Sequence, residues 1–215
     1  MATTSDTALT TMKTALNLAH SQGWRKVTLA AIAAEAGLQQ ADVMAEFTSK
    51  EAILAGFARH IDAEVLQAPL ETDATVRDRL FDLIMRRFDA LTPYRAGIRA
   101  ILHDTVGDPF AALAGLCAAH RSMSLTLEAA GVSASGPFGL LRAMALTALY
   151  LRTLYDWLQT ADDGNDDRIM AQLDKALRRA EKVATAFAGQ RERLAARRQA
   201  RRAARRHTGD AEAEV

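Results

Sequence analysis

The stretch from Val27 to Phe57, VTLAAIAAEAGLQQADVMAEFTSKEAILAGF, limits the possible folds of this chain more than any other segment. Two short helical patterns lie on either side of Gly37, a residue type that takes the left-handed, helix-ending conformation without steric cost. The first pattern carries apolar side chains at helical spacing, and the second carries Val43 and Phe47 four residues apart. The sequence therefore predicts a helix, a tight glycine turn and a second helix, the arrangement that lays the second helix in the major groove of DNA.

These residues resemble the N-terminal domain of TetR-family transcriptional regulators. The pattern of that domain runs T-x-x-x-I-A-x-x-A-G-[VL], then a short helix ending in Phe, then a small polar residue followed by Lys and Glu. Upstream, Gly23 and Trp24 match the end of its first helix. The matching positions of the pattern are Thr28, Ile32, Ala33, Ala36, Gly37, Leu38, Phe47, Ser49, Lys50 and Glu51.

The resemblance implies an all-α protein with a three-helix DNA-binding head and a larger helical body for ligand binding and dimerisation. The expected division is residues 1–48 for the head, 49–189 for the body and 190–215 for an Arg-rich C-terminal tail. The implied function is that of a dimeric repressor, which binds operator DNA and is released by a small apolar effector.

The second helix of the pattern is the expected recognition helix, and it carries amides and acids in place of Arg or Lys. Glutamine side chains can read adenine edges, whereas Asp42 and Glu46, four residues apart, would repel phosphate. The Tyr that the family usually has three residues before the Phe is Met44 here. The residues expected to contact DNA are Thr28, Gln39, Gln40, Asp42, Met44 and Lys50.

Composition supports a helical fold and a reducing compartment. The chain has 49% apolar residues with only 4 Pro and 12 Gly, which favours helices over strands. Its single cysteine, Cys117, cannot form an internal disulfide. The N-terminal segment lacks the basic region and apolar core of an export signal, so we expect a cytoplasmic protein.

The net charge of +1 hides an asymmetry between the tail and the rest of the chain. Residues 191–206 hold eight arginines and one glutamate, so the remainder is acidic by six charges. In a helix these arginines would share one broad face, where like charges repel unless a polyanion relieves them. The tail could contact nucleic acid or an anionic membrane surface. The alternative is a solvated, disordered tail.

Amphipathic patterns predict further helices along the rest of the chain. A first helix follows a cap at Asp6 or Thr7, and another runs from Ser49 to about Gln67. The helix over 75–91 places Leu83, Ile84 and Phe88 inside and its arginines, Arg87 among them, outside. The later helices begin near Pro93, Asp108, Phe138 and Arg168.

The helix over 138–159 is apolar enough to be compared with a membrane span. Arg142, Arg152 and Asp156 inside it would each cost on the order of 3 kcal/mol at the bilayer centre. A buried helix or a subunit interface is the better interpretation. Together with the final helix it would supply the four-helix interface of a homodimer, which a two-fold symmetric DNA reader needs.

A ligand pocket is expected in the body, where mostly apolar side chains with few polar ones favour a hydrophobic or amphipathic effector. Each of these residues also fits plain core packing. The residues expected to line the pocket are Phe88, Tyr94, Ile98, Leu102, His103, Phe110, Met123, Leu127, Met144 and Tyr150.

Catalytic and metal-site signatures find no support, so we expect no enzyme, cofactor or metal. The five histidines show no HExxH spacing, and Cys117 lacks a partner cysteine for zinc.

The sequence also leaves open an alternative function, lipid binding without DNA binding. The stretch from Val76 to Ile101 also resembles the lipid-binding ubiquinone-biosynthesis protein that shares the TetR fold without working on DNA. The acidic recognition helix suits that alternative, in which an isoprenoid-like lipid occupies the body.

Overall fold

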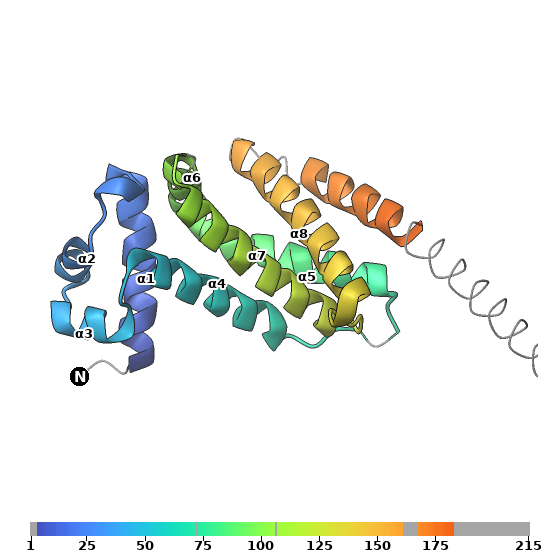
Figure 1. The fold of residues 1–215 in the computed structure, drawn as a ribbon, viewed down its shortest axis with the longest axis horizontal. Coiled ribbons are helices and arrows are strands. Elements are labelled where there is room, and N and C mark those ends of the chain that lie inside the picture. The colour runs from blue at the N-terminus through green and yellow to red at the C-terminus, as the bar shows by residue number, and fades with distance from the viewer. Residues whose placement is uncertain (1–3, 72, 106, 161–166, 183–215) are drawn as a thin grey trace, which may run out of the picture. The chain divides into compact units, whose positions relative to one another are not determined.

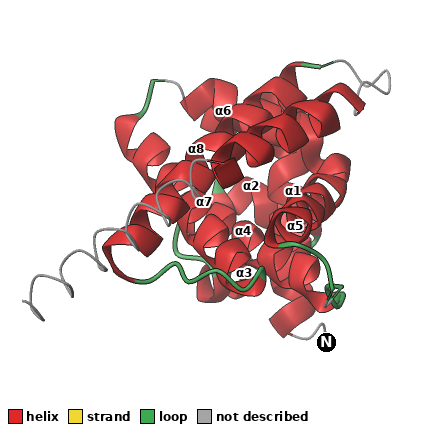
Figure 2. Ribbon diagram, turned by 90° about the vertical axis from the view of Figure 1, so that its right-hand side faces the viewer, coloured by secondary structure: helices red, strands yellow, loops and turns green. Residues whose placement is uncertain are grey.

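The computed structural model describes residues 4–71, 73–105, 107–160 and 167–182, and every regular element in these ranges is a helix (Figures 1 and 2). The predicted all-α fold is confirmed.

The chain divides into two compact units, residues 1–173 and 174–215, and all labelled helices belong to the first. They are α1 (Thr4–Gln22), η1 (Trp24–Lys26), α2 (Leu29–Ala36), α3 (Gln40–Glu46), α4 (Lys50–Gln67), α5 (Val76–Leu91), η2 (Thr92–Tyr94), α6 (Arg95–Thr105), α7 (Pro109–Ala129) and α8 (Gly136–Gln159). Residues 167–182 are also helical. The Arg-rich tail lies outside the described residues.

The head is built around α1, which packs against α2, α3 and the start of α4 (Figure 1). α1 begins at Thr4, earlier than the cap predicted at Asp6 or Thr7. Asp6 instead lies in the first turn, where a carboxylate stabilises the positive end of the helix dipole. The side chains that close the head core are Met12, Ala15, Leu16, Ala19, Trp24, Val27, Ile32, Ala33, Val43 and Phe47.

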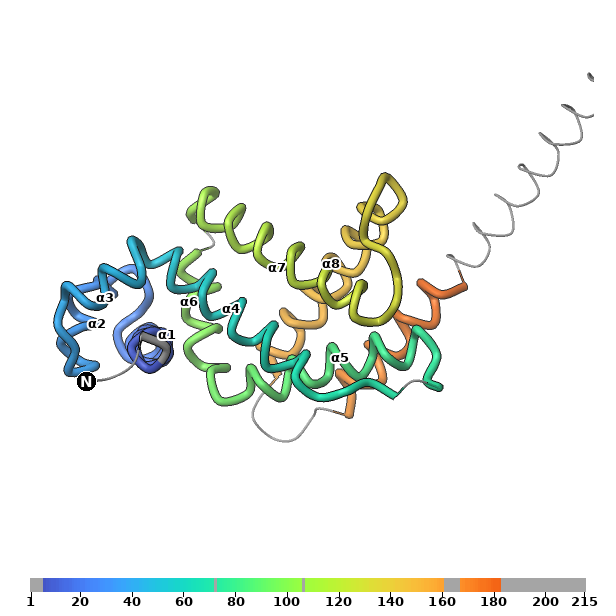
Figure 3. The backbone as a smooth tube through the Cα atoms, turned by 90° about the horizontal axis from the view of Figure 1, so that it is seen from below, coloured from blue at the N-terminus to red at the C-terminus, as the bar shows by residue number. Residues whose placement is uncertain are grey.

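Helix α4 leads from the head into the body (Figures 1 and 3). It starts as predicted at Ser49, whose side chain accepts a hydrogen bond from the Ala52 N–H at 3.1 Å. Its buried side packs against α1 near the head and against α5 and α7 in the body. One helix therefore connects the part that presents α3 with the part that was expected to hold a ligand.

The body core lies between α4, α5, α7 and α8 and contains a cluster of aromatic rings. The Phe88 ring lies 6.0 Å from that of Tyr150 and 5.4 Å from that of Trp157, measured between centroids. Both contacts join α5 to α8. Aromatic pairs at such distances add to the stabilisation that burial itself provides.

Arg87 is an exception to the predicted pattern of α5. The sequence places it outside, but its side chain is buried and donates a hydrogen bond to Asp62 of α4. Arg87 follows Leu83 and Ile84 by one helical turn, so it shares their inward-facing side. The prediction was wrong because the partner that makes this burial tolerable comes from another helix.

Helix α6 provides a second connection between head and body, and α1 packs more extensively on α6 than on any other element. A Cβ atom added at Gly97 would come within 2.4 Å of the Leu16 carbonyl oxygen, so only glycine allows this close approach. Near the other end of α6, the backbone N–H of Arg25 donates to the Asp104 carboxylate at 3.1 Å. The Arg25 guanidinium also donates twice to the Asp104 carbonyl oxygen, at 3.2 Å each.

None of the helices in the described ranges combines the length and the apolar composition that a membrane span requires. Helix α8 keeps Arg142 and Arg152 on its exposed side and buries Leu146, Tyr150 and Trp157. The interpretation of this segment as a packed helix agrees with its contacts to α7.

Candidate nucleic-acid interface

The glycine turn between α2 and α3 has the predicted geometry. The Thr28 hydroxyl accepts a hydrogen bond from the Ala31 N–H at 3.1 Å and caps α2. Gly37 has φ 65° and ψ 27°, the left-handed conformation, and the Leu38 N–H donates to the Ala33 carbonyl at 2.9 Å. These bonds satisfy backbone groups that the end of a helix leaves without partners. The direction of α3 is therefore fixed locally by the sequence.

The rotation of α3 about its axis is fixed by two buried side chains. Val43 is fully buried and Phe47, which caps the C-terminal end, is 5% exposed. With these two residues facing the head core, the remaining side chains face outward. Gln39 is the N-cap, and the Gln40 amide nitrogen lies 3.7 Å from the Met44 sulfur. The exposed positions of this surface are Gln39, Gln40, Ala41, Asp42, Met44 and Ala45.

The exposed surface of α3 is polar and acidic. Asp42 lies exposed in its first turn, Glu46 is half-buried at its end, and no Arg or Lys lies on the helix. The amides of Gln39 and Gln40 and the carboxylate of Asp42 are therefore the exposed hydrogen-bonding groups that α3 could offer to base edges, and any phosphate contacts would come from the flanking elements.

Lys50 lies at the start of α4 but is held by the head itself. Its ammonium group donates to the Trp24 carbonyl at 3.0 Å and lies 4.9 Å from the centroid of the Trp24 ring. A lysine has three donor hydrogens, so two remain for a phosphate. The structure thus gives Lys50 a role in joining α4 to η1, and its predicted DNA contact stays a prediction.

The two basic residues of η1 differ in availability. Arg25 donates its guanidinium hydrogens to Asp104, whereas Lys26 is exposed and forms no ion pair with another described residue. Lys26 stands two residues before the cap of α2, next to a helix N-terminus that itself attracts anions. The sequence analysis did not include Lys26 among the residues expected to contact DNA, although its position just before the Thr28 cap was a usable signal.

The contact between Arg25 and Asp104 has an electrostatic consequence. The Arg25 backbone N–H bonded to Asp104 holds the pKa of that carboxyl below its ordinary value, with smaller contributions from His103 and from the Arg25 charge, against a partial burial that raises it. Asp104 is thus ionised over the physiological range. Its carboxylate accepts a hydrogen bond from the Arg25 backbone N–H, and its own backbone carbonyl accepts from the Arg25 side chain.

The residues predicted to line a ligand pocket do not surround one space. Phe88, Met123, Leu127 and Tyr150 are buried in the body core, and Tyr94 and Ile98 are half-buried. Tyr94 packs edge-on against Phe57, with ring centroids 5.0 Å apart. The exposed members are Leu102, His103, Phe110 and Met144, and Phe110 is 85% exposed. Only Phe88 and Tyr150 are in ring contact with each other.

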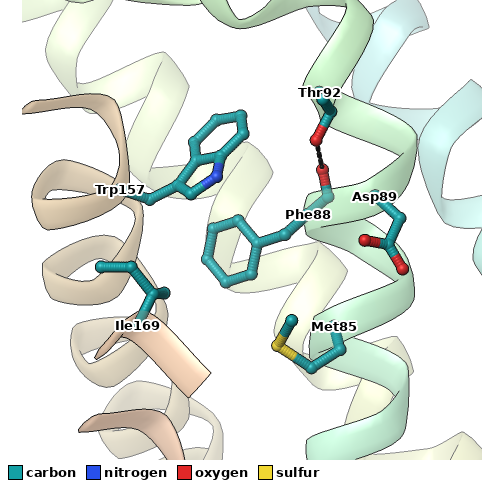
Figure 4. A pocket seen from close by; sticks show the side chains of 6 residues that line it. All are labelled: Met85, Phe88, Asp89, Thr92, Trp157 and Ile169. Carbon is teal, nitrogen blue, oxygen red and sulfur yellow. Dashed lines mark hydrogen bonds between the residues drawn. The ribbon is translucent and has the colours of Figure 1, made fainter. Parts of the chain in front are cut away.

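Two hollows lie near these residues. A cavity of about 10 Å³, room for one water molecule, lies beside Phe88 and Trp157 (Figure 4). A wider open groove of about 380 Å³ lies between α1 and α6 and is lined by Ala19, His20, Gly23, Ala96, Arg99, Ala100, His103 and Asp104. Among the described residues, no group of three or more His, Cys, Asp or Glu side chains is placed to hold a metal ion.

Comparison with known proteins agrees with this geometry at the head. The family model described as bacterial regulatory proteins, tetR family, matches residues 12–56, from α1 to the first turns of α4. The head is a TetR-family helix-turn-helix domain. The match ends within α4, and a search of curated proteins finds no match to this chain.

Solved structures extend the likeness in fold to about four fifths of the chain. A TetR transcriptional regulator from Nitrosomonas europaea superposes with a TM-score of 0.67 at 21% identity, over 81% of this chain and 97% of that chain. Another, from Rhodococcus sp. RHA1, gives 0.56 at 18% identity, over 80% and 93%. The fold is that of TetR-family transcriptional regulators.

Proposed function

We propose that this chain is a transcriptional regulator that binds operator DNA as a homodimer and acts as a repressor. The observation that supports this most directly is the setting of α3. Gly37 fixes its direction, and Val43 and Phe47 hold its inner side, so Gln39 and Gln40 stand exposed at its N-terminal end. That end of a recognition helix is the part that reaches base edges in the major groove.

In this proposal the contacts divide between bases and phosphates. Gln39 and Gln40 face base edges, with Asp42 and Met44 beside them, while Thr28, Lys26 and Lys50 lie toward the phosphates. The N-termini of α2 and α4 add oriented backbone dipoles. The protein has no enzymatic role in the proposed function.

Dimerisation would use the outer side of α8. Met144 is 56% exposed, and Leu141 and Tyr155 are still more exposed, with the small residues Ala145 and Ala148 between them. A helix stripe of this composition allows close approach of the same stripe from a second copy. Two heads related by a two-fold axis would then match two half-sites about one helical turn of DNA apart.

Release of the protein from operator DNA would follow from a shift between two arrangements of the heads in the dimer. Helix α4 runs from the head into the body, so an effector that prefers one arrangement of α4 in the body changes the spacing of the two α3 helices. The aromatic and aliphatic body core suits an effector with a large apolar part.

The test is a gel shift with the DNA upstream of the chain's own gene, carried out over a series of salt concentrations. The Gln39→Ala, Gln40→Ala double variant should bind at least about 10-fold more weakly, because each bidentate amide–adenine pair contributes about 1–3 kcal/mol. The matched control is Gln22→Ala, an exposed glutamine at the end of α1 outside the proposed contacts, which should bind like the unaltered protein.

Two outcomes would contradict the proposal. If binding survives in the double variant but is lost when the chain stops at Gly189, the Arg-rich tail holds the DNA. If no sequence-specific shift is seen and native mass spectrometry finds a co-purified isoprenoid lipid, the chain is a lipid-binding accessory protein of the ubiquinone-biosynthesis type.

A further inference from the structure

An ion cluster inside the body ties three helices together. Asp62 of α4 and Arg87 of α5 are each 5% exposed, and Arg87 donates to one oxygen of the Asp62 carboxylate. The other oxygen accepts a hydrogen bond from Arg121 of α7 at 3.2 Å. The Arg87 guanidinium also lies 5.7 Å from the centroid of the Tyr150 ring, so α8 borders the cluster. A single carboxylate therefore joins α4, α5 and α7.

The charges of the cluster do not balance. It contains one carboxylate and two guanidinium groups, and a buried charge is costly unless it is paired. Asp62 and Arg87 are sealed from solvent and form a neutral pair. The Arg121 side chain is 44% exposed, and Asp62 is its only ion-pair partner within the described residues. The surplus positive charge is thus at Arg121, on the side of the cluster open to solvent.

We infer that Arg121 binds the carboxylate of a monoanionic, amphipathic acid. This rests on the proposed function, in which an effector binds the body. The guanidinium fork matches a carboxylate in two parallel hydrogen bonds, and one surplus charge calls for a monoanion. Cys117 and Leu125, one turn before and after Arg121, are both exposed on the same side of α7. They offer apolar surface for the hydrocarbon part of the acid.

The bound acid would change the ion pair between Asp62 of α4 and Arg121 of α7. A carboxylate paired with Arg121 replaces Asp62 as its partner, and Asp62 keeps Arg87, so both pairs become neutral. The direct ion pair between α4 and α7 is then lost. Because α4 also packs on the head, this exchange of partners gives the effector a route to the position of α3.

The test measures binding by isothermal titration calorimetry in the absence of DNA, with the full chain. The probes are octanoate and 3-phenylpropionate, each compared with its alcohol, 1-octanol and 3-phenyl-1-propanol. Both acids should bind the unaltered protein at least about 10-fold more tightly than their alcohols, since hydrogen bonds to charged groups contribute roughly 1.5–3 kcal/mol. Arg121→Gln should abolish that preference, and Arg121→Lys should restore part of it.

The matched control is Arg178→Gln, which removes an exposed arginine that pairs with Asp174 one turn away and should keep the preference for acids. Thermal unfolding of each variant shows whether it folds, and Arg121→Gln leaves the sealed pair of Asp62 and Arg87 in place. The inference is overturned if neither acid binds, if acids bind no better than alcohols, or if Arg121→Gln binds acids unchanged. Because no DNA is present, such a result leaves the gel-shift test of the proposed function untouched.

Discussion

At Gly97 the backbone of α6 lies directly against that of α1, and a methyl group there has no room. A Cβ atom would come within 2.4 Å of the Leu16 carbonyl oxygen and 3.0 Å of the Leu16 carbonyl carbon. Because both are backbone atoms, relief requires the two helices to move apart. We expect Gly97→Ala to lower the free energy of unfolding by about 1–3 kcal/mol, the usual cost of overpacking, as measured by urea unfolding followed by circular dichroism.

Gly115 is the matched control for this prediction. It lies within α7, and a Cβ atom added there meets nothing within 4 Å. Gly115→Ala should raise stability by roughly 0.5–1 kcal/mol, because alanine favours a helix interior over glycine. If both variants lose stability equally, the close approach of α1 and α6 is not what makes Gly97 necessary.

Asp104, near the other end of α6, makes a pH-dependent contribution to the stability of the contact between α6 and η1. Its folded-state pKa is lowered, chiefly by the hydrogen bond from the Arg25 backbone N–H, so its ionised form stabilises the fold. That contribution is fully present above the ordinary value of 3.8 and is lost as the pH falls through the lowered folded-state pKa. Asp104→Asn should therefore be less stable than the unaltered protein near neutral pH, and the difference should shrink in acid.

Urea unfolding over a pH series checks this expectation. The comparison variant is Asp73→Asn, at an exposed carboxylate in the connection between α4 and α5. A difference between Asp104→Asn and the unaltered protein that grows toward low pH would contradict the assignment of sign.

The α2–α3 turn is where one residue type decides the position of an element. Gly37 has φ 65°, and a Cβ atom there would touch nothing within 4 Å, so the cost of a side chain comes from the backbone alone. Gly37→Ala should destabilise the protein by roughly 1–2 kcal/mol, the cost of the left-handed conformation for an L-residue, whereas Gly37→Asn should be milder. Thermal unfolding of the two variants makes the comparison, and equal effects would contradict a backbone origin.

The helices could be predicted from the sequence because their limits are set by local chemistry. Thr28, Ser49, Thr75 and Asp108 each accept a hydrogen bond from a backbone N–H in the following turn. The helices that begin at Ser49, Thr75 and Asp108 were predicted to start at or near these residues. Such caps depend on residues only a few positions apart. The glycine turn also depends only on residues close together in the chain, so the helix-turn-helix could be predicted from the sequence alone.

The contacts of charged residues were not predictable in this way, because their partners come from distant parts of the chain. Arg87 is buried since Asp62 faces it from α4, and Lys50 lies on Trp24, which precedes it by 26 residues. The pocket residues show the same limit. Phe88 and Phe110 look alike as apolar aromatic residues, yet one is in the core and the other is 85% exposed.

At the scale of the whole molecule, the proposed dimer depends on the outer stripe of α8. Met144→Glu would place a charge in the centre of that stripe, where it would have to be buried against a second copy. We expect this variant to be monomeric by analytical ultracentrifugation at concentrations where the unaltered protein is a dimer. It should also lose affinity for operator DNA, since one head alone contacts only a half-site.

Leu66→Glu provides the control, because Leu66 is an exposed apolar residue near the end of α4, on a different helix from that stripe. It should leave the sedimentation of the protein unchanged. A Met144→Glu variant that sediments as a dimer would show that another surface joins the subunits.

The head is connected to the body through two helices, α4 and α6. This affects which segments can be exchanged when such a protein is joined to the head of another one. A chimera that exchanges only residues 1–48 for the head of another regulator would separate Leu16 from Gly97 and Arg25 from Asp104. The transplanted helices would then meet an α6 shaped for a different partner. Hybrids with altered operator preference should therefore tolerate exchange best when α6 travels together with the head, even though α4 and α5 lie between them in the chain.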